Sequence, residues 1–239
     1  MNRMLIPATP RVVVVIPTYN ESENIPELIE SLLTLDLDLR VLVVDDNSPD
    51  GTAGRVEAYR EQGVEVLRRI DERGYGSAVL AGFQKALKDG ADLVVSMDAD
   101  FSHDPTCIPS LVEACREADV SIGSRYIPGG GTRNWPFYRR FLSRNANRYV
   151  RTVLGMPVQD STSGFRCYRR QVLESLEMKS IRSEGYSFLV EVLYRAFCLG
   201  AEIKEIPICF VDRFRGKSKI NSREIYRSIY MVAWLRFWK

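Results

Sequence analysis

The chain has 239 residues, of which 45% are hydrophobic and 27% are charged, and this is enough apolar material for the core of one compact unit. The formal net charge is only +2, which excludes a uniformly basic protein; Lys and Arg instead gather at 133–151 and 213–227, where we predict basic surfaces that bind anions. No run approaches the roughly 18 uninterrupted apolar residues of a membrane-spanning helix, and the first ten residues lack the features of a secretory signal.

The first half of the chain alternates between predicted strands and helices. Residues 12–16 form a continuous run of Val and Ile that Pro17 closes, which is typical of a strand buried on both faces of a parallel sheet. The pattern continues with strands at 41–44, 64–67, 93–97 and 120–123 and with helices at 23–33, 52–62, 77–88 and 108–117. This alternation predicts an α/β fold with a mainly parallel central sheet flanked by helices.

The second half elaborates this pattern. We predict a mobile glycine-rich loop at 129–136, helices at 139–154 and 186–199, and strands at 165–168 and 202–211. Residues 222–239 mix aromatic and aliphatic residues with arginines, as in an amphipathic helix at a membrane interface or packed on its own domain. The expected organisation is one catalytic domain over 1–221 followed by this helix.

The cysteines and the histidine bear on redox state and metal chemistry. The five cysteines are odd in number and show no Cys-x-x-Cys spacing, so we expect a reducing compartment. With His103 as the only histidine, a structural zinc site is not expected.

Polar residues follow three of the predicted strands. They are residues 17–21 after the first, 45–51 after the second, and Asp98 and Asp100 after the fourth. The carboxyl ends of parallel strands lie at one edge, where open α/β sheets bind ligands, so we expect these residues to converge there. Turn formation alone explains some of them taken singly, but not three at neighbouring strand ends. Because hard divalent cations prefer carboxylate oxygens, this edge is predicted to bind a metal and a phosphate group.

A glycine pair lies at 74 and 76, where a helix is predicted to begin. Such a segment suits an anion. It lacks the third glycine of a dinucleotide fingerprint and follows the third strand, which argues against hydride transfer. A Walker loop is absent, and an aspartyl-nucleophile phosphatase would place its Asp-x-Asp after the first strand.

Five segments together resemble the dolichol-phosphate (polyprenol-phosphate) mannosyltransferases. They are residues 15–21, 43–52, 97–103, 123–126 and 210–213, and the resemblance runs from about Arg11 to the end of the chain. Each segment alone occurs in many inverting glycosyltransferases, whereas the set in this order is specific to polyprenyl-phosphate sugar synthases. The resemblance implies a glycosyltransferase-A fold, transfer of mannose from GDP-mannose to a dolichyl or other polyprenyl phosphate with inversion, and Mg²⁺ or Mn²⁺ as cofactor.

The resemblance also implies roles for particular residues at the donor. Those matching the guanosine-binding positions are Pro17, Tyr19, Glu21, Val44 and Asp46. Those matching the metal-diphosphate motif are Asp98, Ala99 and Asp100, with Asp100 the direct metal ligand. Ser102 stands where some relatives carry Gln at the metal; its side chain is shorter, so a bridging water is expected there.

Further matches concern the acceptor and a basic loop. Arg125, Arg139 and Ser143 match the acceptor-phosphate pocket, and arginine forks suit phosphate oxygens. The sequence does not decide whether Arg139 or Arg140 points inward. Arg213 and Lys219 match a loop over the donor diphosphate, so the resemblance gives Asp100, Arg125, Arg213 and Lys219 the catalytic roles.

The implied setting is the cytoplasmic face of a plasma membrane or endoplasmic reticulum, with the chain bound peripherally. Small membrane-anchoring subunits are expected partners in part of the family, and nucleic acid is not an expected partner. Two alternatives stay open from the residues: another polyprenyl-phosphate sugar synthase that uses a UDP-sugar, and a non-catalytic subunit that binds a nucleotide sugar.

Overall fold

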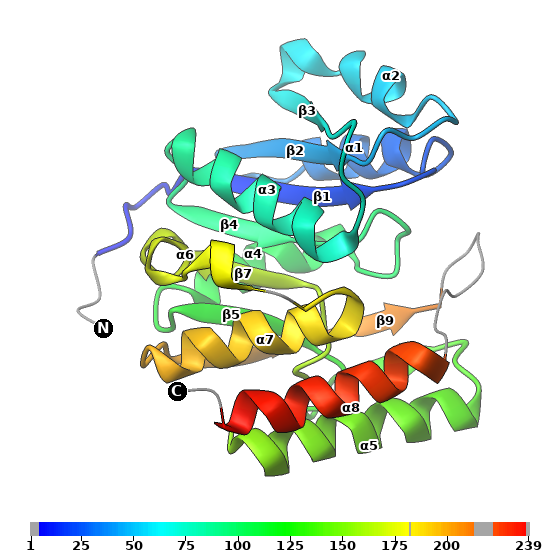
Figure 1. Cartoon of the computed structure of the whole chain (residues 1–239). Helices are drawn as coiled ribbons and strands as arrows, with labels where there is room; N and C mark the ends of the chain where they lie inside the picture. The colour runs from blue at the N-terminus through cyan, green and yellow to red at the C-terminus, as the bar shows by residue number, and fades with distance from the viewer. Residues whose placement is uncertain (1–4, 182, 213–221, 238–239) are drawn as a thin grey trace.

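A computed structural model describes residues 5–181, 183–212 and 222–237. The chain folds as a central β-sheet with helices on both faces (Figure 1). The elements in order are β1 (Val12–Thr18), α1 (Ile25–Leu33), β2 (Leu39–Asp45), α2 (Thr52–Glu57), η1 (Arg60–Gln62), β3 (Val64–Arg68), α3 (Tyr75–Lys88), β4 (Leu93–Ser96), η2 (Pro105–Cys107), α4 (Ile108–Ala114), β5 (Val120–Ser124), β6 (Gly131–Arg133), α5 (Phe137–Leu154), β7 (Arg166–Arg169), α6 (Arg170–Ser175), η3 (Met178–Ser180), α7 (Gly185–Cys198), β8 (Ile203–Pro207), β9 (Cys209–Val211) and α8 (Ser222–Phe237).

The main sheet has seven strands in the part of the chain that is described, in the order β3-β2-β1-β4-β7-β5-β8. Its strand pairs are parallel except where β7 lies antiparallel between β4 and β5. The predicted α/β fold with a mainly parallel sheet is therefore confirmed. Because β7 reverses direction, β5 still runs parallel to β4, and the residues after β5 emerge at the same edge as those after β1, β2 and β4.

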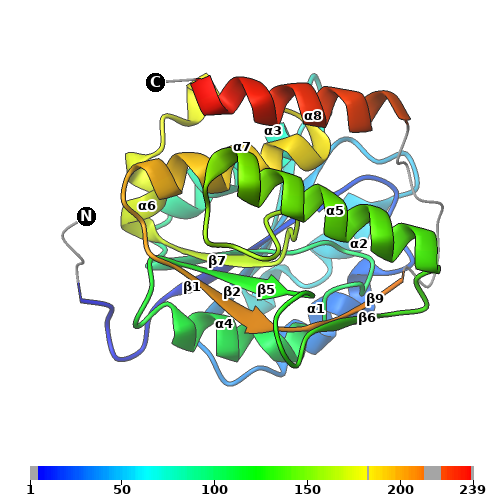
Figure 2. The same cartoon turned by 90° about the horizontal axis from the view of Figure 1, so that it is seen from below.

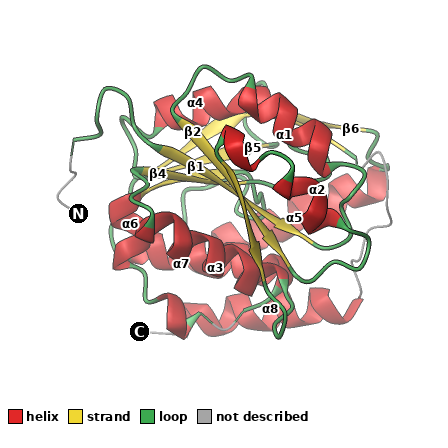
Figure 3. Cartoon of the chain, turned by 90° about the horizontal axis from the view of Figure 1, so that it is seen from above, coloured by secondary structure: helices red, strands yellow, loops and turns green. Residues whose placement is uncertain are grey.

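Strand β1 shows why a run of Val and Ile forms the centre of this sheet. Val13 and Val15 belong to a core cluster with α3 and α7, whereas Val12, Val14 and Ile16 belong to a second cluster with α1 and α4. Successive strand side chains point to opposite faces, so a strand covered on both sides must be apolar throughout. Figures 2 and 3 show the two helical layers, with α1, α2 and α4 on one face of the sheet and α3, α6, α7 and α8 on the other.

Helices α5 and α8 lie side by side at one end of the molecule (Figures 1 and 2). The Tyr149 hydroxyl of α5 donates a hydrogen bond to the Ile229 carbonyl of α8 at 3.1 Å, and Val232 and Leu235 of α8 are buried in the core. None of the helices in the described ranges is both long and apolar enough to cross a bilayer.

Several predicted elements differ from the structure. Strand β1, predicted to close at Pro17, continues through it to Thr18, and the helix predicted at 108–117 ends at Ala114. The helix expected at 52–62 ends at Glu57 and is followed by the short turn η1, in which no residue is buried. The strand expected at 202–211 is two strands, because β8 ends at Pro207, which has no N–H to continue the ladder, and β9 pairs instead with β6. The segment 129–136, predicted to be a loop, thus contains the three-residue strand β6.

Candidate functional site

Three neighbouring parallel strands bring the predicted donor residues to one edge of the sheet. Thr18 at the end of β1 pairs with Asp45 of β2, and Val15 of β1 pairs with Ser96 of β4. Residues 19–21, 46 and 98–100 therefore leave the sheet side by side. The convergence expected from the sequence is confirmed, while the ligands assigned to these residues remain predictions.

The loops at this edge are stiffened by short polar contacts. The Asp45 carboxylate accepts hydrogen bonds from the Ser48 hydroxyl at 2.5 Å and the Thr18 hydroxyl at 3.1 Å. The Thr52 hydroxyl donates to Asp50 at 2.6 Å and accepts from the Glu21 backbone N–H at 3.0 Å. These polar residues therefore form the local turns and also join the β1–α1 loop to the β2–α2 loop.

The residues matched to guanosine binding surround the end of β2. Val44 is fully buried against α3, and Pro17 pairs with it across β1 and β2. The Tyr19 ring has the Arg73 guanidinium 5.0 Å from its centroid. Glu21 accepts a hydrogen bond from the Asn24 side chain at 2.8 Å. The set therefore combines an aromatic face with acidic groups, which suits a nucleoside.

Asp46 is the acidic member of this set that is buried from solvent. Its Oδ1 lies 3.0 Å from Arg69 Nε, close enough for an ion pair but too poorly aligned for a hydrogen bond. Its Oδ2 accepts a hydrogen bond from the Gly74 backbone N–H at 2.8 Å. Asp46 is therefore held from two sides before any ligand arrives.

The Asp98–Asp100 turn is fixed by its own neighbours. The Asp98 backbone N–H donates to His103 Nδ1 at 3.1 Å. Asp100 Oδ1 accepts from the Ser102 hydroxyl at 2.5 Å and from the Ser102 N–H at 3.1 Å. Burial lowers the pKa of His103, which keeps the imidazole neutral and able to accept at Nδ1. Ala99 is buried, and Phe101 adopts a left-handed φ of 57°, so the turn is tight.

The two carboxylates of the Asp98–Asp100 turn fit a magnesium or manganese ion that is shared with a substrate. The described residues contain no group of three His, Cys, Asp or Glu side chains that would form a cage. Asp98 and Asp100 supply hard carboxylate oxygens, and Mg²⁺ is commonly bound by one or two carboxylates together with substrate phosphates. Ser102 contacts Asp100 directly, so its hydroxyl orients the predicted metal ligand.

Arg125, matched to the acceptor phosphate, is engaged by a buried carboxylate that the sequence did not reveal. Its Nε and Nη2 donate to Asp160 at 2.7 and 2.6 Å, and its backbone N–H donates to the same group at 2.9 Å. Asp160 is fully buried and Arg125 is 6% exposed. Burial alone would raise the pKa of Asp160, but the Arg125 charge and its hydrogen bonds outweigh burial and hold that pKa below its ordinary value.

Aromatic rings enclose the same arginine. The Arg125 guanidinium carbon lies 5.3 Å from the ring centroids of Tyr126, Trp135 and Phe210. The edge of Phe210 contacts both Trp135 and His103, with ring centroids 5.3 and 5.4 Å apart. This aromatic cluster therefore connects Arg125 with the histidine beneath the Asp98–Asp100 turn.

A cavity of about 230 Å³ opens beside Arg125. The described residues that line it are Arg125, Tyr126, Gly130, Gly131, Thr132, Arg140 and Arg144. This lining contains three arginines and no acidic residue, and the charge of Arg125 is balanced by Asp160. Among the described lining residues, Arg140 and Arg144, four residues apart on one face of α5, therefore supply positive charge that no lining carboxylate balances.

Arg139 and Ser143 lie outside this lining. Arg139 forms an ion pair with Asp212 at 2.7 Å, and its guanidinium lies 4.3 Å from the Trp135 ring centroid. Ser143 lies against the phenol of Tyr126. Of the two neighbouring arginines between which the sequence did not decide, Arg139 is the more buried, with its side chain 19% exposed, whereas Arg140 is exposed and lines the cavity. Arg213 and Lys219 lie outside the described residues.

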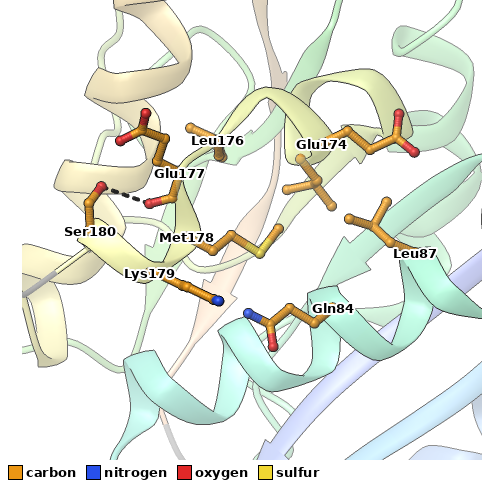
Figure 4. Close-up of a pocket in the computed structure, with 9 residues that line it drawn as sticks. Gln84, Leu87, Glu174, Leu176, Glu177, Met178, Lys179 and Ser180 are labelled. Carbon is orange, nitrogen blue, oxygen red and sulfur yellow. Dashed lines mark hydrogen bonds between the residues drawn. The ribbon is translucent and has the colours of Figure 1, made fainter.

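A larger cavity of about 640 Å³ lies away from this edge, between the second half of α3 and the segment 173–180 (Figure 4). Gln84 and Leu87 face Leu176, Met178 and Lys179 across it. Helix α3 begins at the carboxyl edge of the sheet and runs away from it, so this cavity belongs to the opposite edge.

Several residues of the site were not predicted from sequence. Asp160, Arg69 and Tyr75 each contact a predicted residue from a distant segment, whereas Trp135 contacts Arg139 only four residues along the chain. The polar run 159–164 before β7 was the available signal for Asp160, and the glycine pair at 74 and 76 was the signal for Tyr75.

Comparison with known proteins identifies relatives over most of the chain. Residues 13–177 match the family model of glycosyl transferase family 2. The chain is 42% identical over 229 residues to a polyprenol monophosphomannose synthase of Mycolicibacterium smegmatis, covering 94% of this chain and 86% of that protein. It is 44% identical to an undecaprenyl-phosphate mannosyltransferase of Micrococcus luteus, with 93% of each covered. It is 38% identical to a dolichol-phosphate mannosyltransferase of Pyrococcus furiosus, covering 96% of this chain and 64% of the other.

Solved structures share the fold. A glucosyl-3-phosphoglycerate synthase from Mycobacterium tuberculosis, in complex with Mn²⁺, UDP-glucose and phosphoglyceric acid, superposes with a TM-score of 0.70 over 97% of this chain and 81% of that chain. The sequence identity is 21%, so this likeness concerns the fold.

Proposed function

Because this chain belongs to glycosyl transferase family 2, with the polyprenol-phosphate mannosyltransferases among its relatives, we propose that it transfers mannose from GDP-mannose to a polyprenyl phosphate. The observation that carries the proposal is that an acidic edge and an arginine-lined cavity lie at the same side of the sheet. Asp46, Asp98 and Asp100 form the acidic edge, and Arg140 and Arg144 line the cavity. The acidic edge suits a nucleotide with its metal ion, and the arginine-lined cavity suits a second phosphate group.

The proposed reaction needs no strong general base. A polyprenyl phosphate has a second pKa of about 6, so near neutral pH it is already a nucleophilic anion. We propose in-line displacement with inversion, in which a phosphate oxygen of the lipid attacks the anomeric carbon as the bond to GDP breaks. The chain's contribution is to bring the two anions together in the right orientation.

The roles proposed at the donor come from the family resemblance, and the placement of these residues at one edge supports them. Asp100 and Asp98 would hold Mg²⁺ or Mn²⁺, which when bound neutralises charge on the departing diphosphate. Pro17, Tyr19, Glu21, Val44 and Asp46 would hold the guanosine. Arg213 and Lys219 are proposed to neutralise the leaving GDP by the family resemblance alone.

The acceptor phosphate is proposed to occupy the cavity beside Arg125. Arg125 is fixed by Asp160 and shapes the wall, while Arg140 and Arg144 supply net positive charge. Replacing Arg144 with Ala is expected to raise the KM for polyprenyl phosphate about tenfold, with little change in the KM for GDP-mannose. Arg148→Ala, on the same helix one turn further and not among the lining residues, is the matched control. An effect of Arg144→Ala confined to GDP-mannose would move this arginine to the donor side.

Peripheral association with the cytoplasmic face of a membrane is part of the proposal, with small anchoring subunits as candidate partners. Its support is a set of exposed apolar side chains on the two adjacent helices α5 and α8. The exposed apolar side chains there are Phe137, Tyr138, Phe141, Leu142, Ile229, Tyr230, Trp234 and Phe237. Exposed aromatic residues beside arginines suit the headgroup level of a bilayer.

The test of the proposed function is transfer of radiolabel from GDP-mannose to an organic-extractable product. The assay contains the purified chain, a short-chain polyprenyl phosphate and Mn²⁺, with chelator, UDP-glucose and UDP-N-acetylglucosamine as controls. Label in the lipid phase that chelator abolishes, and that the UDP-sugars neither supply nor suppress, supports the proposal. Transfer only from a UDP-sugar would replace the donor, and metal-dependent GDP binding without transfer, in the presence of membranes, would favour a binding subunit.

A further inference from the structure

The first turn of α3 contacts both predicted ends of the donor site. The Gly74 N–H donates to Asp46, and the Ser77 hydroxyl accepts from Arg69 Nη2 at 2.9 Å. Tyr75 is the residue that follows Gly74, and its hydroxyl donates a hydrogen bond to Asp98. A single helical turn therefore joins the group that follows β2 with the group that follows β4.

Arg69 is the buried cation of this arrangement. It is 8% exposed and Asp46 is 6% exposed, so the pair is shielded from water. Within the described residues, Arg69 Nε and Nη1 have no hydrogen-bond acceptor, and only Nη2 is satisfied, by Ser77. Burying a guanidinium with unsatisfied N–H donors costs free energy, and a nearby carboxylate must offset that cost. Two carboxylates pair with Arg69: buried Asp46 at 3.0 Å and largely exposed Glu72 at 3.8 Å, so Asp46 is the closer and better shielded partner.

Tyr75 has the corresponding position beside Asp98. Space for this contact depends on Gly164: a Cβ there would lie 2.7 Å from the Tyr75 hydroxyl and 3.7 Å from Asp98 Oδ1. Phe188 of α7 packs edge-on against the Tyr75 ring, with centroids 6.2 Å apart. Phe188 thus holds the Tyr75 ring in place while the Tyr75 hydroxyl contacts the Asp98 carboxylate.

The glycines of the turn allow this close packing. Gly74 has a φ of 144°, which disfavours other residues, and a Cβ on Gly76 would lie 2.8 Å from the Phe188 ring. The glycine pair at 74 and 76 is therefore explained by the path of the backbone around Asp46 and Phe188. A nearby phosphate is not needed to explain it.

We propose that Arg69 and Tyr75 are positioning residues of the donor site, with Arg69 orienting Asp46 at the nucleobase end and Tyr75 orienting Asp98 at the diphosphate end. This inference rests on the proposed function in assigning Asp46 and Asp98 to opposite ends of one nucleotide. It assigns the two residues separable effects, because Asp46 is expected to contact the base and Asp98 to act with the metal. A merely structural role would give the two variants the same effect.

The experiment measures equilibrium binding of GDP and UDP to the full chain by calorimetry, with and without Mn²⁺. Arg69→Lys is expected to weaken GDP binding about tenfold in both conditions and to reduce the preference for GDP over UDP. Tyr75→Phe is expected to leave metal-free GDP binding within about twofold of wild type, and to reduce about tenfold the gain in affinity that Mn²⁺ provides.

Matched controls exist on the surface of the same molecule. Arg68→Lys changes the neighbouring arginine, whose ion pair with Glu57 is half exposed, and Tyr59→Phe removes a phenol that donates to Glu30 at 2.8 Å. Both controls are expected to bind GDP as the wild type does. Ser77→Ala leaves Arg69 in place and removes its one hydrogen-bond acceptor, so it should give a smaller effect of the same kind if Arg69→Lys fails to fold.

Several results would overturn the proposal. One is an equal loss of GDP binding with and without Mn²⁺ in both variants, in proportion to a lowered melting temperature. Another is a change in the GDP-to-UDP preference that arises from Tyr75→Phe and not from Arg69→Lys or Ser77→Ala. The binding test contains no lipid and so does not depend on transfer. A wild type that binds GDP with Mn²⁺ here but transfers no mannose in the radiolabel assay would contradict the proposed function and leave this test valid. A wild type that binds neither nucleotide would contradict both.

Discussion

Replacing Asp160 with Asn should strongly destabilise the fold. Asp160 accepts three hydrogen bonds from Arg125, through the backbone N–H, Nε and Nη2, at 2.9, 2.7 and 2.6 Å. The amide removes the negative charge and turns one acceptor into a donor that faces these N–H groups. Since the Arg125 guanidinium remains buried without a counter-charge, the expected loss is about 3 to 5 kcal/mol in the free energy of unfolding. For a chain of this size that lowers the melting temperature by about 6 to 20 °C.

The assay is urea unfolding of the wild type and Asp160→Asn, with Glu57→Gln as control. Glu57 pairs with Arg68 at the surface, where both side chains are half exposed, so the control should stay within about 0.5 kcal/mol of wild type. A loss below about 1 kcal/mol for Asp160→Asn at pH 7 would refute the argument that this pair is buried and mutually dependent.

The pH dependence adds a second check. The folded-state pKa of Asp160 is lowered, so its contribution is fully present above the unfolded value of about 3.9 and is lost as pH falls through the folded pKa. The difference in stability between wild type and Asp160→Asn should therefore stay constant from pH 7 to pH 5 and narrow below about pH 4. A difference that shrinks already between pH 7 and pH 5 would assign the effect to another titrating group.

Three further predictions concern the metal, the core and the membrane. Asp100→Ala should reduce Mn²⁺-dependent mannosyl transfer by about 100-fold or more, measured as label in the lipid phase, and unchanged activity would remove Asp100 from the metal site. Gly82→Ala should lower stability by about 1 to 3 kcal/mol in urea unfolding, because the added methyl collides with Val15 beneath α3; wild-type stability would contradict that packing. Phe141→Ser should weaken sedimentation with anionic phospholipid vesicles about tenfold, whereas Leu199→Ser, at the exposed residue that follows α7, should not, and equal effects would contradict the role given to α5.

The parts of the fold that were predictable are those encoded by local patterns. A run of apolar residues such as Val12–Ile16 is typical of a strand that helices cover on both faces. Alternate residues of this run belong to the two core clusters, one on each face of the sheet. Parallel order then places Asp46 and Asp98 at one edge without knowledge of side-chain positions. The family resemblance added the identities of the ligands, which the spacing of the residues did not supply.

The parts that were not predictable depend on contacts between distant segments. The insertion of β7 between β4 and β5 pairs Leu93 with Arg169, and no local pattern specifies such a partner. Likewise Asp160 meets Arg125 across 35 residues. Whether Arg139 or Arg140 faces the cavity depends on how α5 is rotated against the domain, because adjacent helical residues point about 100° apart.

The most direct test of the account is the structure of the lipid product formed from GDP-mannose and polyprenyl phosphate, determined by mass spectrometry and by NMR of the anomeric centre. Single in-line displacement predicts one mannose per lipid phosphate, joined through a β linkage. An α-linked product would contradict the proposed displacement, and a lipid carrying a different sugar, or none, would contradict the assigned reaction.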